Sequence, residues 1–252
     1  MSRLSSPKHF EGQDALTHLK KARKKGAIAS AETHGTEMPG HLSAGADSAK
    51  ETALLLLILW ILFYKMSLPL NTIYTLYGLI TLGWLFWKVG RSSLLGWARL
   101  ERLHRLIEEE RFEIEHHREQ EKEELIALYQ QKGFHGELLE RVIEVLMADD
   151  NRLLEVMLEE ELGLSLESYD HPLKQGFGAG LGVIFAAAFG GVSLFFNNLF
   201  FTISSLTFVY IFSTLVAAKC EGNNLLKATI WNISLGAFIL LLVYFAMQLV
   251  NS

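Results

Sequence analysis

Three uncharged apolar runs near the C-terminus constrain the fold of this chain more than any other feature. They cover residues 177–196, 199–218 and 228–250. Each run is close to the roughly 20 residues that an α-helix needs to cross the hydrocarbon core of a bilayer. The breaks between the runs, Asn197-Asn198 and residues 219–224, have turn-forming compositions. The sequence therefore predicts an all-α integral membrane protein.

Two further membrane spans are predicted nearer the N-terminus, on either side of Pro69. The run from residue 70 to Trp87 is nearly of bilayer length, but the uninterrupted run 53–64 is too short to cross by itself. The first span must therefore extend either toward Pro69 or back into residues 44–52. With both spans included, the sequence predicts five transmembrane helices.

The distribution of basic residues gives an independent test of this topology. Of 23 Lys and Arg residues, 8 precede the first apolar run, 12 lie between the second and third spans, and 2 lie in residues 219–227. Lys65 alone falls on the opposite side of a five-span protein. Because Lys and Arg are enriched in cytoplasmic loops, we expect the N-terminus and residues 88–176 in the cytoplasm and the C-terminus across the membrane.

The segment between the second and third spans is strongly acidic. Residues 101–167 contain 20 of the 28 carboxylates of the chain against 8 Lys and Arg residues. A charge run of this kind is read either as a solvated polar helix or as a segment that gathers cations. The spacing of the carboxylates favours the second interpretation, a segment that gathers cations.

Four glutamates and a histidine fall on one face of a predicted helix. They lie at offsets 0, 3, 7, 11 and 14, a stripe roughly 80° wide at about 100° per residue, and are Glu110, Glu113, His117, Glu121 and Glu124. Like charges three or four residues apart destabilise a helix, so a positive partner is needed. Carboxylate oxygens suit Mg²⁺, Ca²⁺ and Mn²⁺, and imidazole extends the set toward iron, zinc, cobalt and nickel.

The same stretch is poor in apolar side chains. Between Ile107 and Leu125 only Phe112 and Ile114 are apolar. We therefore expect this helix to project from the membrane rather than to lie in a monomer core, and to pair with a second copy in a homodimer.

Two shorter helices are predicted after the break at residues 132–136. The first carries apolar residues at helical spacing from Leu138 to Met147. Asp149 or Asp150 can cap the second, which should stop at Gly163. Met157 and Glu161 lie four residues apart on it, so a soft and a hard candidate ligand share one face. Taken alone, Met157 is a core residue and Glu161 a solvated one, unless the three helices pack over the first.

The segments EEERFEIEHHREQEKEELIALYQQKGF and LLERVIEVLMADDNRLLEVMLEEELGL, followed by a small-residue apolar span, resemble the vacuolar iron transporter family over about residues 88–250. The resemblance implies five transmembrane helices with a cytoplasmic three-helix metal-binding domain between spans two and three, and a dimer that exchanges Fe²⁺ or Mn²⁺ for protons. It assigns metal-binding roles to residues at matching positions: Glu110, Glu113, Glu121, Glu124, Glu161 and Met157. Leu158 replaces a second methionine of the family.

The first two spans depart from the family pattern. Gapless counting places Glu51 where the family has an intramembrane aspartate, Ile80 at a glutamate position and Lys88 at a methionine position. Glu51 and Asp47 are candidate replacements in the transport pathway, because an acid within a membrane is costly and usually functional. They can equally form a cytoplasmic approach to the first span.

Together these features predict four parts: a polar, basic segment 1–50, a transmembrane hairpin 51–90, the acidic metal-binding domain 91–172 and three spans in 173–252. The expected function is proton-coupled export of Fe²⁺ or Mn²⁺ from the cytoplasm, with Zn²⁺ or Co²⁺ as further ions the ligands would accept. The alternative is a transport-inactive relative that senses or buffers metal, or docks a protein.

Enzymatic and nucleic-acid functions are not expected. No phosphate loop, nucleophile elbow or HExxH motif occurs in the chain. The basic cluster at residues 20–25 lacks interleaved aromatic residues, so it favours contact with anionic lipid head groups.

Overall fold

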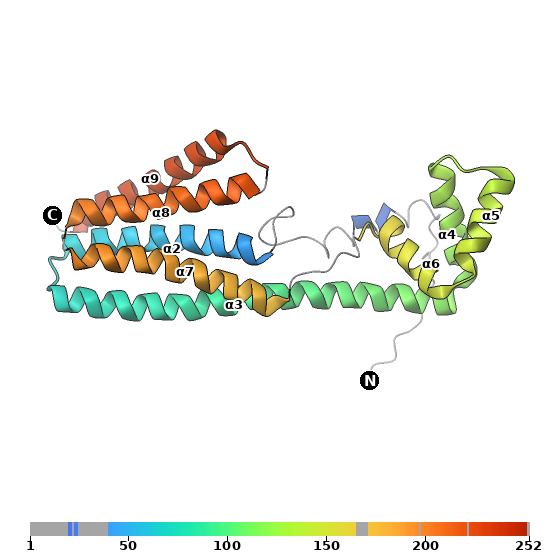
Figure 1. The fold of residues 1–252 in the computed structure, drawn as a ribbon, viewed down its shortest axis with the longest axis horizontal. Coiled ribbons are helices and arrows are strands. Elements are labelled where there is room, and N and C mark those ends of the chain that lie inside the picture. Colours follow the sequence, from blue (N-terminus) through green and yellow to red (C-terminus); the bar gives the residue numbers. More distant parts are fainter. Residues whose placement is uncertain are drawn as a thin grey trace. The chain divides into compact units, whose positions relative to one another are not determined.

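The computed structural model describes residues 20, 21, 23, 24, 40–164, 171–196, 198–220 and 222–250. Within these ranges every regular element is a helix (Figure 1). The chain divides into two compact units. The acidic unit combines Met1–Ala31 with Ala98–Tyr169, and the membrane unit combines Glu32–Trp97 with Asp170–Ser252.

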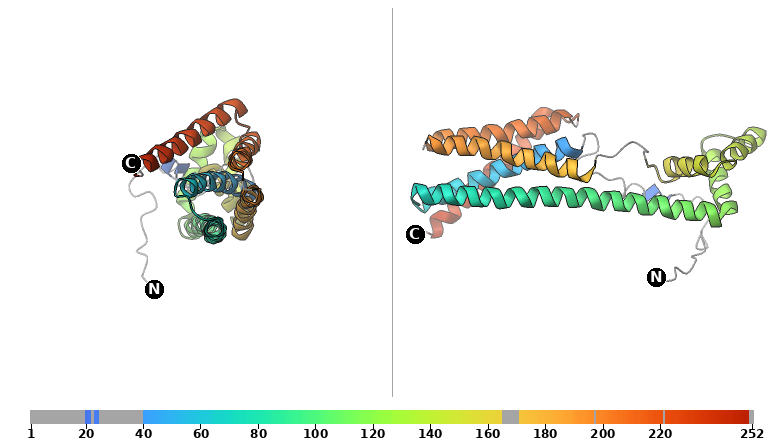
Figure 2. Two further views of the ribbon diagram at one scale, coloured as in Figure 1. Left: turned by 90° about the vertical axis from the view of Figure 1, so that its left-hand side faces the viewer. Right: turned by 60° about the horizontal axis from the view of Figure 1, so that its bottom comes forward.

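The membrane unit consists of α2 (Gly40–Lys65), the first part of α3 (Leu70–His116), α7 (Pro172–Phe195), α8 (Leu199–Cys220) and α9 (Leu225–Val250). Helix α2 packs against α7, α8 and α9, as the end-on view in Figure 2 shows. Among the described residues, three segments are long and apolar enough to cross a membrane: Pro172–Phe195, Phe200–Lys219 and Leu225–Leu249. Helices α2 and α3 are not in that set, so the five-span topology stays a prediction.

The bounds of helix α2 show in which direction the short apolar run 53–64 is extended. The helix begins at Gly40 and ends at Lys65, so it grows backward through residues 44–52 rather than forward to Pro69. A turn follows in which Ser67 adopts a positive φ of 51°. The first turns of α2 consequently lie in the part of the sequence that we assigned to the N-terminal segment.

Small residues bring α2 and α7 into backbone contact. A Cβ atom on Gly182 would overlap the carbonyl oxygen of Gly45, and one on Gly178 would overlap that of His41. Side chains larger than hydrogen are therefore excluded at these two positions. Such close packing of glycines is a common way to join helices in a membrane.

The acidic unit is a helical module with its own apolar core. It contains the last part of α3, then α4 (Arg118–Gln131), α5 (Gly136–Met147), α6 (Asp150–Val156) and the π-helix η1 (Met157–Glu161). Buried members of its core come from all of these elements: Leu103, Ile114, Leu125, Leu139, Ile143, Leu153, Leu154, Met157, Leu158, Leu162 and Leu164.

The predicted ends of the second short helix, which is the third predicted helix of the acidic unit and consists of α6 and η1, are confirmed. The Asp149 carboxylate accepts a hydrogen bond from the Arg152 amide at 2.9 Å, which makes Asp149 the N-cap of α6. Gly163 follows η1 with a φ of 65°. The Leu164 amide then donates to the Leu158 carbonyl at 2.9 Å, as in glycine-based helix stops.

Candidate metal centre

Three glutamates from three different elements converge inside the acidic unit. Glu110 comes from α3, Glu121 from α4 and Glu161 from η1. Each offers a carboxylate oxygen, and these oxygens lie within 4.8 Å of one another. All three side chains are buried, with exposed fractions of 4%, 0% and 3%. We refer to Glu110, Glu121 and Glu161 as the glutamate triad.

Glu124 adjoins the triad from the next turn of α4. Its side chain is fully buried, and it forms a hydrogen bond with Glu161. A bond between two carboxyl groups requires one proton, which Glu161 donates in its neutral form. Four carboxyl groups thus share one buried space.

The electrostatics of this group are clearest at Glu161. Burial raises its pKa well above the usual 4.5, and the nearby charges of Glu110, Glu124 and Glu121 raise the pKa further, as does the hydrogen bond with Glu124. Clustered carboxylates in a low-dielectric interior are stabilised either by protons or by a bound cation. Their all-oxygen donor set matches hard divalent ions such as Mn²⁺.

The predicted single stripe on one helix is wrong. Helix α3 ends at His116, and His117 has φ −128° and ψ 33° before α4 begins at Arg118. The triad therefore forms through a corner that brings Glu121 back toward Glu110. Neither proline nor glycine marks this corner in the sequence, which is why periodicity alone did not reveal it.

The expectation that this segment cannot be buried in a monomer is also wrong. Ile114, Glu121 and Leu125 are at most 2% exposed within the single chain. The missing apolar partners come from α5, α6 and η1. Burial of the glutamates consequently needs no second copy.

Glu113 and His117 lie at the corner and outside the triad. Both side chains are half-buried. The His117 amide donates to the Glu113 carbonyl at 2.7 Å, and the His117 carbonyl accepts from the Glu121 amide at 3.1 Å. In this conformation the backbone of His117 links the two helices that carry the triad.

Met157 and Glu161 occupy a π-helical turn. The Leu162 amide donates to the Met157 carbonyl five residues earlier, at 3.1 Å. Met157 is fully buried in the apolar core, and Glu161 belongs to the acidic group. Such π-turns are frequent at functional sites, but the sequence carries no signal for this one.

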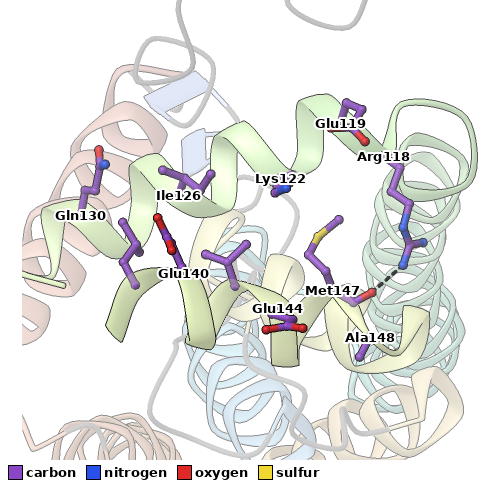
Figure 3. Close-up of a pocket in the computed structure, with 11 residues that line it drawn as sticks. Arg118, Glu119, Lys122, Ile126, Gln130, Glu140, Glu144, Met147 and Ala148 are labelled. Atoms are coloured by element: carbon purple, nitrogen blue, oxygen red, sulfur yellow. Dashed lines mark hydrogen bonds between the residues drawn. The ribbon is translucent and has the colours of Figure 1, made fainter. Parts of the chain in front are cut away.

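A separate groove lies on the other side of α4, between α4 and α5 (Figure 3). Its volume is about 730 Å³, and Ile126, Ile143 and Met147 contribute its apolar surface. Charged residues such as Arg118 and Glu144 also line it, and the Arg118 guanidinium donates to the Met147 carbonyl at 2.5 Å. The groove shares no residue with the triad. The groove and the buried triad are therefore two separate features on opposite sides of α4.

The two candidate pathway acids, Asp47 and Glu51, lie on α2 in the membrane unit. Glu51 is paired with Lys88 of α3, with 2.6 Å between Oε2 and Nζ, and Asp47 is paired with Lys50 at 3.0 Å. From the sequence we placed Lys88 at a ligand position but did not identify it as the partner of Glu51. A lysine within an apolar run was the available signal.

The basic cluster at residues 20–25 lies partly within the described residues. The guanidinium of Arg23 donates to the Glu160 carbonyl at 3.2 Å inside the acidic unit. Lys25 lies outside the described residues. The lipid contact that we predicted for this cluster stays a prediction.

Comparisons with known proteins identify the family. The model of the VIT family matches residues 97–248. Neither the curated proteins nor the solved structures gave a match. Members of the VIT family are membrane transporters of iron or other metals rather than enzymes, which agrees with the apolar helices of the membrane unit. The matched region covers the whole glutamate triad and α7 to α9, and the chain belongs to the VIT family of vacuolar iron transporters.

Proposed function

We propose that the protein moves Fe²⁺ or Mn²⁺ out of the cytoplasm in exchange for protons, and that the glutamate triad collects the ion. The observation that carries this proposal is the burial of three carboxylates whose oxygens lie within 4.8 Å of one another. The family match supports the transport of a metal in general terms. The choice of ion, the coupling and the direction belong to the proposal.

The chemistry of the triad supports a divalent ion rather than a monovalent one. Glu110, Glu121 and Glu161 carry up to three negative charges in a space from which water is largely excluded. A divalent ion compensates more of that charge for the same number of contacts. Glu124 can either bind the ion or accept the hydrogen bond that it forms with Glu161.

The same proposal includes the topology and the dimer. The acidic unit faces the cytoplasm, five helices cross the membrane and the C-terminus lies on the far side. Two copies assemble in the membrane. The basis for the topology is the distribution of Lys and Arg along the chain, and the basis for the dimer is the resemblance to the family.

A pair of matched variants tests the metal site. Glu121 and Glu119 lie two residues apart on α4, but Glu121 is fully buried in the triad and Glu119 is exposed. We expect Glu121→Gln to lower the Mn²⁺ affinity of the full-length protein in detergent by tenfold or more, and Glu119→Gln to leave it unchanged. Isothermal titration with Mn²⁺ measures both. Equal affinities for the two variants would refute the triad as the binding site.

Flux into proteoliposomes tests transport itself. With an imposed pH gradient, wild-type protein should carry Mn²⁺ or Fe²⁺ into the vesicles, and Glu121→Gln should slow the flux at low metal concentration. Glu119→Gln again serves as the control. Wild-type vesicles that behave like empty vesicles would refute transport.

One observation favours a second function. The family match begins at residue 97, after α2 and the first part of α3, and the acids of α2 are paired with lysines. A relative that keeps the acidic unit but no longer transports would act as a membrane-anchored metal sensor or buffer, or as a docking module. Mn²⁺ binding at the triad without any flux is the result that selects this function.

A further inference from the structure

An ion pair joins α2 and α3 inside the membrane unit. The ammonium of Lys88 lies 2.6 Å from the carboxylate of Glu51. The Lys88 side chain is 8% exposed and that of Glu51 is 50% exposed. A lysine with so little solvent contact requires a counter-charge, and Glu51 provides it.

The pair lies beside the middle of α7, which is long and apolar enough to cross a membrane. Ala49 and Ala53, which flank Glu51 on α2, pack in one buried cluster with Ala186 of α7. Ala186 is 14 residues beyond Pro172, where α7 begins, or about 21 Å along the axis at 1.5 Å per residue. The hydrocarbon core is about 30 Å thick. If α7 crosses the bilayer from near Pro172, Glu51 therefore lies at a depth where an isolated carboxylate would be costly.

A second pair lies one turn away on α2. Asp47 is four residues before Glu51, and its carboxylate lies 3.0 Å from the ammonium of Lys50. The two carboxylates and the two ammonium groups sum to zero charge. A divalent cation would neutralise the same two carboxylates, so the two lysines supply the charge that such an ion would bring.

A second contact joins α3 to α2 close to Lys88. Trp84 lies one turn before Lys88 on α3, and its indole N–H donates to the Thr52 hydroxyl at 3.0 Å. The Thr52 hydroxyl in turn donates to the Ser48 carbonyl at 2.5 Å. The Lys88 ammonium also lies 5.9 Å from the centre of the Trp84 ring. Two α3 side chains one turn apart, Trp84 and Lys88, therefore contact consecutive residues of α2.

We propose that Lys88 is a tethered counter-ion that occupies the carboxylate of Glu51 and keeps divalent metal ions from binding at that level of the membrane unit. This inference rests on the proposed function, because it states a condition for metal passage: the Lys88–Glu51 pair must open before an ion uses Glu51. In a chain whose pair never opens, metal bound at the triad goes no further.

Neutral and charged substitutions of Lys88 distinguish two roles for the pair: blocking metal binding at Glu51, or only attaching α3 to α2. Lys88→Leu removes the positive charge and adds no ligand atom, and Lys88→Arg keeps the charge. If the pair served only to attach α3 to α2, Lys88→Leu would lower thermal stability without changing metal binding. A tethered counter-ion predicts a gain in metal affinity that Lys88→Arg does not produce.

The experiment measures Mn²⁺ binding to the full-length protein in lipid nanodiscs by electron paramagnetic resonance. The parent carries Glu121→Gln and Glu161→Gln, so that the triad does not contribute. We expect Lys88→Leu to raise Mn²⁺ affinity at least tenfold over this parent, Lys88→Arg to match the parent, and the further change Glu51→Gln to abolish the gain.

Two results would overturn the inference. One is an affinity of Lys88→Leu no higher than that of the parent, measured on protein with a cooperative thermal transition. The other is a gain that persists after Glu51→Gln. Lys88→Ala provides the same comparison if Lys88→Leu does not fold. Failure of the proposed function is recognised separately, as absence of Mn²⁺ binding to the wild-type protein with its triad intact.

Discussion

At the scale of single residues, the acidic unit separates two kinds of glutamate that differ little in sequence context. Glu121 and Glu124 on α4 are fully buried, whereas Glu119 and Glu123 beside them are exposed. The helical spacing that selected the first pair therefore identified the side chains that face inward. It did not distinguish Glu110, which is buried, from Glu113, which is half-buried, because that difference depends on the corner at His117.

The raised pKa of Glu161 predicts how stability depends on pH in the metal-free protein. The folded state holds a proton at Glu161 that the unfolded state releases above about 4.5, the usual glutamate pKa. Its contribution to stability is therefore complete below that pH and is lost as pH rises through the raised pKa. A tenfold difference in proton affinity between the folded and unfolded states corresponds to about 1.4 kcal/mol.

Thermal unfolding of the full-length protein in chelator, followed across this pH range, measures the effect. Glu161→Gln stays neutral at every pH, so its transition temperature should vary less with pH than that of the wild type. Parallel curves for the two proteins would contradict the assignment. In the presence of Mn²⁺ the wild-type affinity should increase with pH, because the ion replaces the proton.

At the scale of elements, two local departures from regular helix create the site. The corner at His117 separates α3 from α4, and the π-turn at Met157–Glu161 ends the third helix. Together they bring Glu121 and Glu161 to Glu110. A regular helix through residues 110–124 would have displayed the same glutamates along its side, without a shared interior.

Glycine substitutions test the contact between α2 and α7. A Cβ on Gly182 would overlap the Gly45 carbonyl oxygen, whereas a Cβ on Gly83 of α3 would meet nothing within 4 Å. We expect Gly182→Ala to destabilise the membrane unit by about 1–3 kcal/mol through overpacking. Gly83→Ala should be neutral or stabilising, by up to about 1 kcal/mol.

The transition temperatures of the two variants in detergent give this comparison directly. Both variants place the same methyl group in a helix, so intrinsic helix propensity cancels. Similar transition temperatures would mean that the close contact of α2 and α7 at Gly182 does not contribute to stability.

At the scale of the whole molecule, the chain joins a membrane unit to a buried acidic site through the shared helix α3. The family match covers the Ala98–Tyr169 part of the acidic unit together with α7 to α9, and it leaves out α2 and the first part of α3. The glutamate triad, which is the candidate metal site, thus lies in the part of the chain that the family model describes. The paired acids Asp47 and Glu51 belong to the part that it does not.

Cysteine labelling tests the topology of the whole chain. In a Cys220→Ser background, single cysteines at positions 30, 130 and 252 are exposed to an impermeant reagent in oriented vesicles. Five spans predict that positions 30 and 130 react from the same side and position 252 from the other. Reaction of positions 130 and 252 from one side would remove the five-span topology.

The sequence by itself determined the features that depend on local pattern. Apolar runs such as 228–250 predicted the helices of the membrane unit, Asp149 and Gly163 predicted the ends of the third helix, and the quoted acidic segments indicated the family. These signals are local because hydrophobic periodicity, capping and turn chemistry each act over a few residues.

The tertiary structure alone decided which residues meet. Glu110, Glu121 and Glu161 form one group because a π-turn and a corner at His117 bring three elements together, and neither proline nor glycine marks that corner. The burial of Glu121 depends on apolar side chains from α5, α6 and η1, which a single helix does not reveal. The Lys88–Glu51 pair likewise joins residues 37 positions apart. Contacts between distant residues arise from packing, which no local pattern encodes.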